Sequence, residues 1–218
     1  MERPRKTGIG YQHVKIFSFG NALKIDLFEG KHRRAKIMII GIAEKEELLQ
    51  IRRLYMQAFP KAERKPFAMI KQKVQKGSMD ILAVRGENLA LTGFAITLKY
   101  KDMVLIDYFA IAPEFRNRGV GSEALRLLRE WYRDIRLFLE IEVVDPEAVN
   151  YEERRRRKQF YLRNGFSETG KFVSIFGVRM ELMTYQCEIS CQDYIQLYEH
   201  GLSKAFAEVI KGCGDDRE

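Results

Sequence analysis

Residues 105–122 read Leu-Ile-Asp-Tyr-Phe-Ala-Ile-Ala-Pro-Glu-Phe-Arg-Asn-Arg-Gly-Val-Gly-Ser, and this stretch decides the fold prediction. Its apolar residues up to Ile111 predict a strand, and the helical spacing of apolar residues after Gly119 predicts a helix. Gly119 and Gly121 lack a Cβ atom, so the backbone can approach a ligand closely, and the N–H groups that open a helix favour an anion. The turn therefore predicts an anion site that suits a pyrophosphate. Further donors there are Arg116, Arg118 and Ser122.

This turn differs from two common phosphate-binding motifs, since it lacks the Gly-Lys-Ser/Thr of a P-loop and the Gly-x-Gly-x-x-Gly of a dinucleotide fold. Outward from it, short turns between β-type segments predict an antiparallel meander, and the strand after the helix predicts a parallel crossover. We expect strands at 38–43, 79–86, 90–100, 103–111, 136–144, 166–176 and 178–188, and helices at 44–58, 66–75, 119–133, 150–163 and 190–212, with a frayed end at 212–216.

Length and composition indicate one globular α/β domain with appendages: 218 residues, 46% hydrophobic and 31% charged. The longest apolar runs, such as residues 37–40, are far shorter than the ~20 residues of a membrane span, so no membrane association is expected. Cys187, Cys191 and Cys213 are odd in number and have no histidine close by. We therefore expect neither a disulfide framework nor a metal site, and a cytoplasmic location.

The net charge of +8 is concentrated at the start of the chain. Residues 1–36 hold nine lysines and arginines against three acids, interleaved with aromatic residues. This pattern predicts a poorly specific tail or a segment upstream of the true start, with a nucleic-acid-binding or acidic-lipid-binding arm as the weaker alternative. A second basic cluster at 154–158 lies in a helical pattern, where a solvated helix face is the simpler interpretation.

A second motif lies about 40 residues further along: Phe160-Tyr161-Leu162-Arg163-Asn164-Gly165-Phe166. Together with the Arg-x-x-Gly-x-Gly of residues 116–121, it resembles the GNAT superfamily of acyl-CoA-dependent N-acyltransferases. The resemblance implies a six- to seven-stranded mixed sheet flanked by helices. It also implies a domain at 38–188, with a basic extension at 1–37 that is either disordered or upstream of the start, and a C-terminal helix and tail at 189–218.

The resemblance also implies where acetyl-CoA binds. Its pantetheine arm would lie where the strand ending at Ile111 separates from the strand at 136–144, paired with the backbone of Ile111. The pyrophosphate would be held by the loop and the first helical turn, that is by Arg116, Asn117, Arg118, Gly119, Val120, Gly121 and Ser122. Many relatives have an Asn and a small residue where this chain has Arg154 and Arg157, so Asn150 is a weaker cofactor-binding candidate.

Two residues are predicted to carry the chemistry. Tyr161 matches the tyrosine that often protonates the leaving thiolate in the superfamily, and a packed aromatic residue is the alternative. Alternation in the strand predicts that Leu105, Asp107, Phe109 and Ile111 share one face, which makes Asp107 the candidate base. Glu140 and Glu142 on the next strand compete with it, and a structural or acceptor-positioning role is an equal alternative for any of the three.

The region before the second helix lines the acceptor side in this superfamily. There Glu63 is a candidate for holding a cationic amine, although a salt bridge in a surface loop is the simpler expectation. Cys187 has no histidine beside it, so an acyl-enzyme route is not expected.

These observations predict an acetyl-CoA-dependent N-acetyltransferase that acts on an amine of a small molecule or peptide by direct attack in a ternary complex. The alternatives are a noncatalytic acyl-CoA sensor or adaptor and, further off, a nucleic-acid-associated protein. Tyr194, Tyr198 and Phe206 of the last helix could pack on the core or on a second subunit, so a homodimer is a further expectation.

Overall fold

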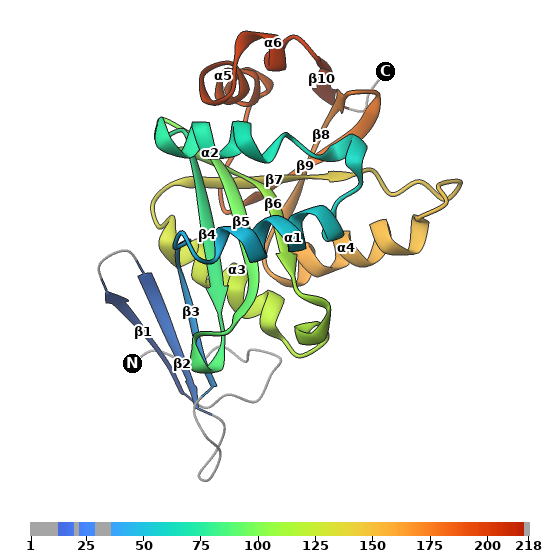
Figure 1. The fold of residues 1–218 in the computed structure, drawn as a ribbon. Helices are drawn as coiled ribbons and strands as arrows, with labels where there is room; N and C mark the ends of the chain where they lie inside the picture. Colours follow the sequence, from blue (N-terminus) through green and yellow to red (C-terminus); the bar gives the residue numbers. More distant parts are fainter. Residues whose placement is uncertain (1–12, 20–21, 29–35, 216–218) are drawn as a thin grey trace.

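The computed structural model describes residues 13–19, 22–28 and 36–215 of the chain. Its described strands form a single mixed sheet in the order β1-β2-β3-β4-β5-β6-β7-β9-β8-β10, in which β6 and β7 alone are parallel (Figure 1). The strands are β1 (His13–Phe19), β2 (Ala22–Phe28), β3 (Lys36–Ile42), β4 (Met79–Arg85), β5 (Leu91–Tyr100), β6 (Met103–Ile111), β7 (Arg136–Glu142), β8 (Ser167–Ile175), β9 (Val178–Tyr185) and β10 (Ile210–Asp215).

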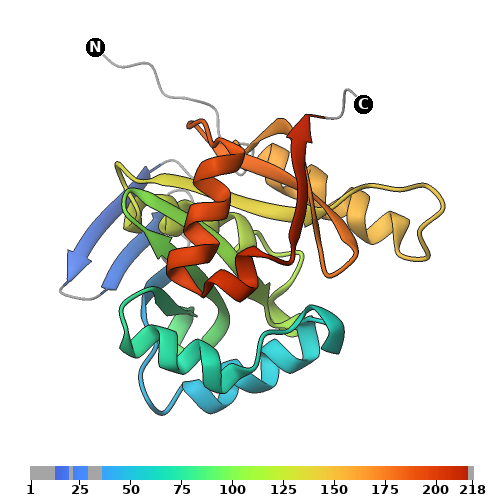
Figure 2. The same cartoon turned by 90° about the horizontal axis from the view of Figure 1, so that it is seen from above.

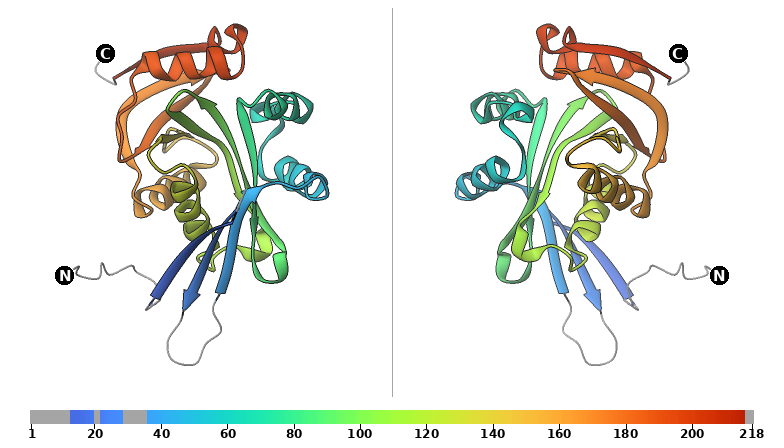
Figure 3. Two further views of the ribbon diagram at one scale, coloured as in Figure 1. Left: turned by 90° about the vertical axis from the view of Figure 1, so that its left-hand side faces the viewer. Right: turned by 90° about the vertical axis from the view of Figure 1, so that its right-hand side faces the viewer.

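Helices cover both faces of the sheet (Figure 3). On one face lie α1 (Leu48–Ala58), α2 (Phe67–Gln75) and α5 (Cys191–Gly201); on the other lie α3 (Val120–Trp131) and α4 (Tyr151–Arg163). Helices α1 and α3 bury the apolar stripes that their sequence spacing predicts, for example Ile51, Leu54 and Tyr55 of α1, whereas the charged helix α4 buries Tyr161. The mixed α/β architecture and the seven expected strands, now β3 to β9, are confirmed. In the described part of the chain, no helix has the length and apolar character that crossing a membrane requires.

The sheet is larger than predicted at both of its ends. β1 and β2 form an antiparallel hairpin that continues the sheet from β3, so part of the segment expected as a separate basic extension belongs to the fold. The rest of that segment, residues 1–12, 20–21 and 29–35, lies outside the described residues.

The predicted last helix at 190–212 and the frayed end after it are wrong. The chain forms α5, a short helix α6 (Lys204–Ala207) and β10, which pairs antiparallel with β8 (Figure 2). This return brings the Cα atom of Cys213 within 5.6 Å of that of Cys191, and the two form a disulfide. The expectation that the cysteines form no disulfide is therefore also wrong, and the cysteines no longer support a reducing compartment.

A β-bulge at Asp107 changes the direction of the side chains along β6. Ile96 pairs with Tyr108 and Thr97 pairs with Ile106, so Asp107 has no residue opposite it in β5. Leu105 and Tyr108 consequently face the α1 side, whereas Phe109 and Ile111 face the α3 side. The predicted common face of Leu105, Asp107, Phe109 and Ile111 is wrong, because strict alternation assumes a strand without a bulge.

The parallel pairing between β6 and β7 is short. It runs from Met103 with Arg136 to Ile106 with Leu139 and then ends. Residues 107–111 of β6 therefore have no partner strand on their β7 side, and the sheet opens there.

Candidate functional site

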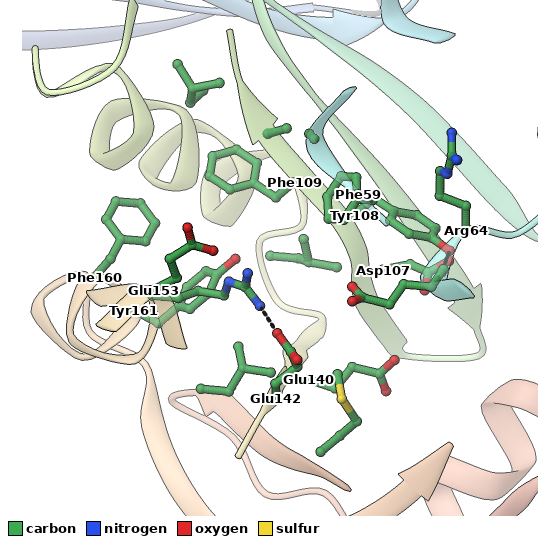
Figure 4. Close-up of a pocket in the computed structure, with 18 of the residues that line it drawn as sticks. Phe59, Arg64, Asp107, Tyr108, Phe109, Glu140, Glu142, Glu153, Phe160 and Tyr161 are labelled. Carbon is green, nitrogen blue, oxygen red and sulfur yellow. Dashed lines mark hydrogen bonds and ion pairs between the residues drawn. The ribbon is translucent and has the colours of Figure 1, made fainter. Parts of the chain in front are cut away.

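A cavity of about 1010 Å³ lies at the opening between β6 and β7 (Figure 4). Its walls come from the segment between α1 and α2, the ends of β6 and β7, the turn before α3, helix α4, the β8–β9 hairpin and α6. Figure 4 shows Phe160 and Tyr161 on one side of the cavity and Phe59, Tyr108 and Arg64 on the other.

The turn before α3 presents unused backbone donors to this cavity. Gly119 precedes the helix with a φ of 77°, a left-handed conformation that glycine adopts without strain. Within the described ranges, the backbone N–H groups of Asn117, Gly119, Gly121 and Ser122 make no hydrogen bond, and these four residues line the cavity. Because the positive end of the α3 dipole lies at the same place, an anion is favoured there.

Gly121 also allows close packing at this wall. A Cβ atom there would lie 3.2 Å from the Phe160 ring, so a larger residue would have to displace that ring. Arg116 lines the cavity as well, but its Nε donates to the Ile111 carbonyl at 2.9 Å. The carbonyl of Ile111, whose backbone is predicted to pair with pantetheine, therefore already has a partner.

The other predicted cofactor residues separate into two groups. Ile111, Arg116, Asn117, Gly119, Gly121 and Ser122 line the cavity, and Arg118, Val120 and Asn150 do not. The side chain of Val120 is buried beneath α3. Asn150 accepts a hydrogen bond from Arg154 at 2.7 Å and donates one to Glu142 at 3.4 Å, so its side-chain amide is engaged by these two residues.

The sequence predicts a solvated helix face at residues 154–158, but Arg154 and Arg157 form ion pairs. Both pair with the carboxylate of Glu142, which is buried at the end of β7, at 2.8 and 3.0 Å. Arg157 also lines the cavity, so these two departures from the family pattern form one charge cluster with Glu142.

Tyr161 lines the cavity and is 8% exposed. Its hydroxyl makes no hydrogen bond to any residue in the described part of the chain, although its ring packs against Phe160 and Phe166. Burial raises the pKa of Tyr161 to about 12, and the Arg157 guanidinium, one turn earlier on α4, opposes part of this rise. The phenol is therefore protonated at neutral pH.

Asp107 is a buried carboxylate with one oxygen that no described residue engages. Its side chain is 2% exposed, its Oδ1 accepts from Lys65 Nζ at 2.7 Å, and its buried Oδ2 has no hydrogen-bond partner. Lys65 is held in place by aromatic rings, since its ammonium lies 5.2 Å from the ring centroid of Tyr108 and 5.6 Å from that of Tyr198.

The two competing carboxylates have both oxygens engaged. Glu140 accepts hydrogen bonds from the hydroxyls of Tyr194 and Tyr198 on α5, and burial raises its pKa. Glu142 is engaged by the two arginines of α4. Of the three predicted base candidates, Asp107 alone has an oxygen available to a ligand.

The segment between α1 and α2 is fastened to β6 by tyrosine hydroxyls. Tyr108 donates to the Glu63 carbonyl at 2.8 Å and accepts from the Lys65 N–H at 3.0 Å, and Tyr55 donates to the Lys65 carbonyl at 3.0 Å. Glu63 lines the cavity, and the surface salt bridge expected for it is not found among the described residues. Burial and the nearby Glu142 raise the pKa of the Glu63 carboxyl.

Sequence reasoning missed several residues of the site. Lys65 and Asp107 are 42 positions apart, and no local pattern links them. Phe176 at the β8–β9 turn lines the cavity, and so does Phe206, which the unexpected helix α6 places there. Tyr194 and Tyr198, which looked exposed, are buried in the chain's own core and so give no support to a homodimer.

The fold and the cavity define a class of protein. The mixed sheet opens between two parallel strands, and unused amide donors lie at the opening. The resemblance implies this arrangement for an acyl-CoA-dependent acyltransferase. A family model described as the acetyltransferase (GNAT) family matches residues 48–166, more than half of the chain, and the chain belongs to that family. It is therefore an acetyltransferase.

Solved structures of this family share the fold. A Bacteroides thetaiotaomicron protein assigned to the GNAT acetyltransferases superposes with a TM-score of 0.62 at 20% identity, covering 77% of this chain and 98% of that one. A spermidine N-acetyltransferase from Vibrio cholerae, solved with CoA and spermine, superposes with a TM-score of 0.54 at 14% identity, covering 67% and 94%. None of the curated proteins compared with the chain matches it.

Proposed function

We propose that the protein transfers the acetyl group of acetyl-CoA to a primary amine of a small molecule or peptide by direct attack in a ternary complex. One observation carries this proposal. A single cavity joins the unused amides before α3, the hydroxyl of Tyr161 and the free oxygen of Asp107. The spermidine acetyltransferase with the same fold supports a small amine as acceptor.

The donor set fits acetyl-CoA. Four backbone N–H groups at a helix start, with Arg116 and Ser122 beside them, suit a pyrophosphate. The apolar wall of Ile111 and Phe160 next to them suits the pantetheine arm. Acetyl-CoA, when bound, supplies the thioester that donates the acetyl group.

The residues of the chain would divide the proton transfers. The neutral amine attacks the carbonyl carbon of the thioester, so a C–N bond forms and the C–S bond breaks. Asp107 Oδ2 accepts a hydrogen bond from the amine and, directly or through water, receives the proton that the nitrogen loses. Tyr161, protonated at neutral pH, donates its proton to the sulfur. Holding both reactants in one cavity supplies much of the rate.

Direct transfer is supported by the position of the free thiol. Cys187 does not line the cavity, and burial raises its pKa, which lowers its reactivity. No described lining residue is a cysteine that could carry the acetyl group.

Initial-rate kinetics test this proposal. The concentrations of acetyl-CoA and of a primary amine are varied together, while released thiol and the N-acetylated product are measured. Direct transfer predicts intersecting double-reciprocal lines and an unchanged rate for Cys187→Ala. Parallel lines would contradict it, and binding of acetyl-CoA without turnover of any amine would favour the acyl-CoA sensor.

A further inference from the structure

The side of the cavity away from Phe160 is mostly apolar. We call it the acceptor end and define it by residues 58–66, the β8–β9 hairpin and α6. Phe59, Phe176 and Phe206 contribute rings to it, and Val178 and Met180 contribute aliphatic surface. The ammonium of Lys65 lies 6.0 Å from the ring centroid of Phe206, which places α6 and Asp107 at the same end.

Most charged groups at the acceptor end have partners. Asp107 is paired with Lys65, and Glu140 is hydrogen-bonded by two tyrosine hydroxyls. Glu63 is the exception, since it is exposed and makes no ion pair with a described residue. Arg64 adds a positive charge. One buried acceptor atom, Asp107 Oδ2, has no hydrogen-bond partner among the described residues, so this end offers one buried place for an amine.

Phe176 is placed in this wall at a conformational cost. Its φ is 49°, a left-handed conformation that bulky side chains rarely adopt, and Gly177 follows with a φ of 81°. Such a turn favours Asn or Gly at both positions. The Phe176 side chain is nonetheless 63% exposed and lies at the cavity. Strained residues that expose a large apolar group are typical of ligand contacts.

Phe206 is held against Phe176 by the C-terminal fold. The two rings meet edge to face, with centroids 6.0 Å apart. α6 lies between α5 and β10, which the Cys191–Cys213 disulfide joins, and β10 begins with Ile210 opposite Ile175. The wall formed by Phe176 and Phe206 is therefore built by residues outside the region that the family model matches.

We infer that the acceptor end selects primary amines with a single positive charge and an apolar or aromatic body, which Phe176 and Phe206 contact. Asp107 Oδ2 receives the amine, and the two rings cover the carbon chain that follows it. A second ammonium on that chain would have to leave water for the wall formed by Phe176 and Phe206, which itself carries no charge, and this is unfavourable. This inference rests on the proposed function and deepens it by naming the acceptor class.

Two amines of the same length test it. Hexylamine and 1,6-diaminohexane differ by one terminal ammonium, and kcat/KM is measured for each with saturating acetyl-CoA. We expect hexylamine to be preferred at least tenfold, since small differences in an apolar pocket already discriminate by 10- to 200-fold. Phe176→Ala and Phe206→Ala are each expected to raise KM for hexylamine about tenfold. Phe172→Ala is the matched control, because Phe172 lies on β8 outside the cavity lining, with its ring beside Arg179 of β9.

The experiment distinguishes failure of this inference from failure of the proposed function. Equal or better use of the diamine would overturn the inference, as would unchanged KM in both Phe176→Ala and Phe206→Ala. Acetyl-CoA affinity is measured in every variant and is expected to stay within twofold of the parent. If the protein binds acetyl-CoA and acetylates no amine, the proposed function fails, and the inference fails with it.

Discussion

The Lys65–Asp107 pair is predicted to be the most sensitive charge pair of the site. Among the described residues, Lys65 is the one that pairs with Asp107, so Lys65→Met leaves a carboxylate that is 2% exposed and whose second oxygen is already unpaired. Removing one member of a buried ion pair typically costs about 3–5 kcal/mol, because the remaining charge is left without compensation. For a domain of this size, that corresponds to a melting temperature lower by roughly 6–20 °C.

Denaturant and thermal unfolding measure the effect. The double variant Lys65→Met/Asp107→Leu is expected to regain most of the loss, since replacing both members of a buried pair by apolar residues is often neutral. Arg155→Met is the surface control, because Arg155 and Glu152 are 2.8 Å apart and more than half exposed. Exposed pairs contribute at most about 1 kcal/mol.

Two results would refute the reasoning. A loss below about 1 kcal/mol in Lys65→Met would mean that the carboxylate is not buried without compensation. A double variant as unstable as the single variant would mean that Lys65 acts through its packing against Tyr108 and Tyr198 instead of through its charge.

Three further outcomes are expected. Tyr161→Phe should lower kcat about 100-fold if Tyr161 is the acid. Because the pKa of Tyr161 is about 12, ionisation of its phenol should not lower kcat of the parent below about pH 10. A pH profile of kcat from 6 to 10 in both proteins checks this, and an unchanged kcat in Tyr161→Phe would mean that Tyr161 is not the acid. The unfolding free energy should fall between pH 10 and pH 12 by roughly 2–3 kcal/mol for each of Tyr161 and Tyr55. The reason is that both tyrosines keep their protons in the folded state at a pH where the unfolded chain already loses them. Urea unfolding across that range measures the effect, and an unfolding free energy that does not change with pH would contradict it. Cys191→Ser/Cys213→Ser removes a cross-link spanning 22 positions and should lower the unfolding free energy by about 3 kcal/mol. It should also raise KM for the amine and leave the affinity for acetyl-CoA unchanged, with Cys187→Ala as control. An unchanged KM would mean that the disulfide does not hold the acceptor wall in place.

Much of the fold follows from local sequence patterns. Apolar periodicity predicts the strands β3 to β9 and the helices α1 to α3, and clear breaks bound the elements, such as Pro60 after α1 and Gly165 after the charged helix α4. The anion site is also local, because its donors belong to one turn of the chain. These features need no knowledge of distant partners.

The parts that sequence patterns missed depend on contacts between distant residues. The bulge at Asp107 is defined by the pairing of β6 with β5, so the alternation rule placed Leu105 and Phe109 on one face although they lie on opposite faces. The disulfide depends on β10 returning to β8. The arginines of α4 looked solvated because Glu142, their partner, is on another element.

Binding of acetyl-CoA tests the central claim most directly, that the turn before α3 holds the cofactor's pyrophosphate. Thermal unfolding is compared with and without acetyl-CoA in the parent, in Gly121→Trp, whose new side chain would displace Phe160 and fill the turn, and in Leu49→Trp on the exposed side of α1. At one hundred times the dissociation constant, bound ligand adds about 2.7 kcal/mol, or roughly 5–11 °C for a domain of this size. We predict that shift in the parent and in Leu49→Trp and none in Gly121→Trp. No shift in the folded parent, or an equal shift in Gly121→Trp, would contradict the assignment.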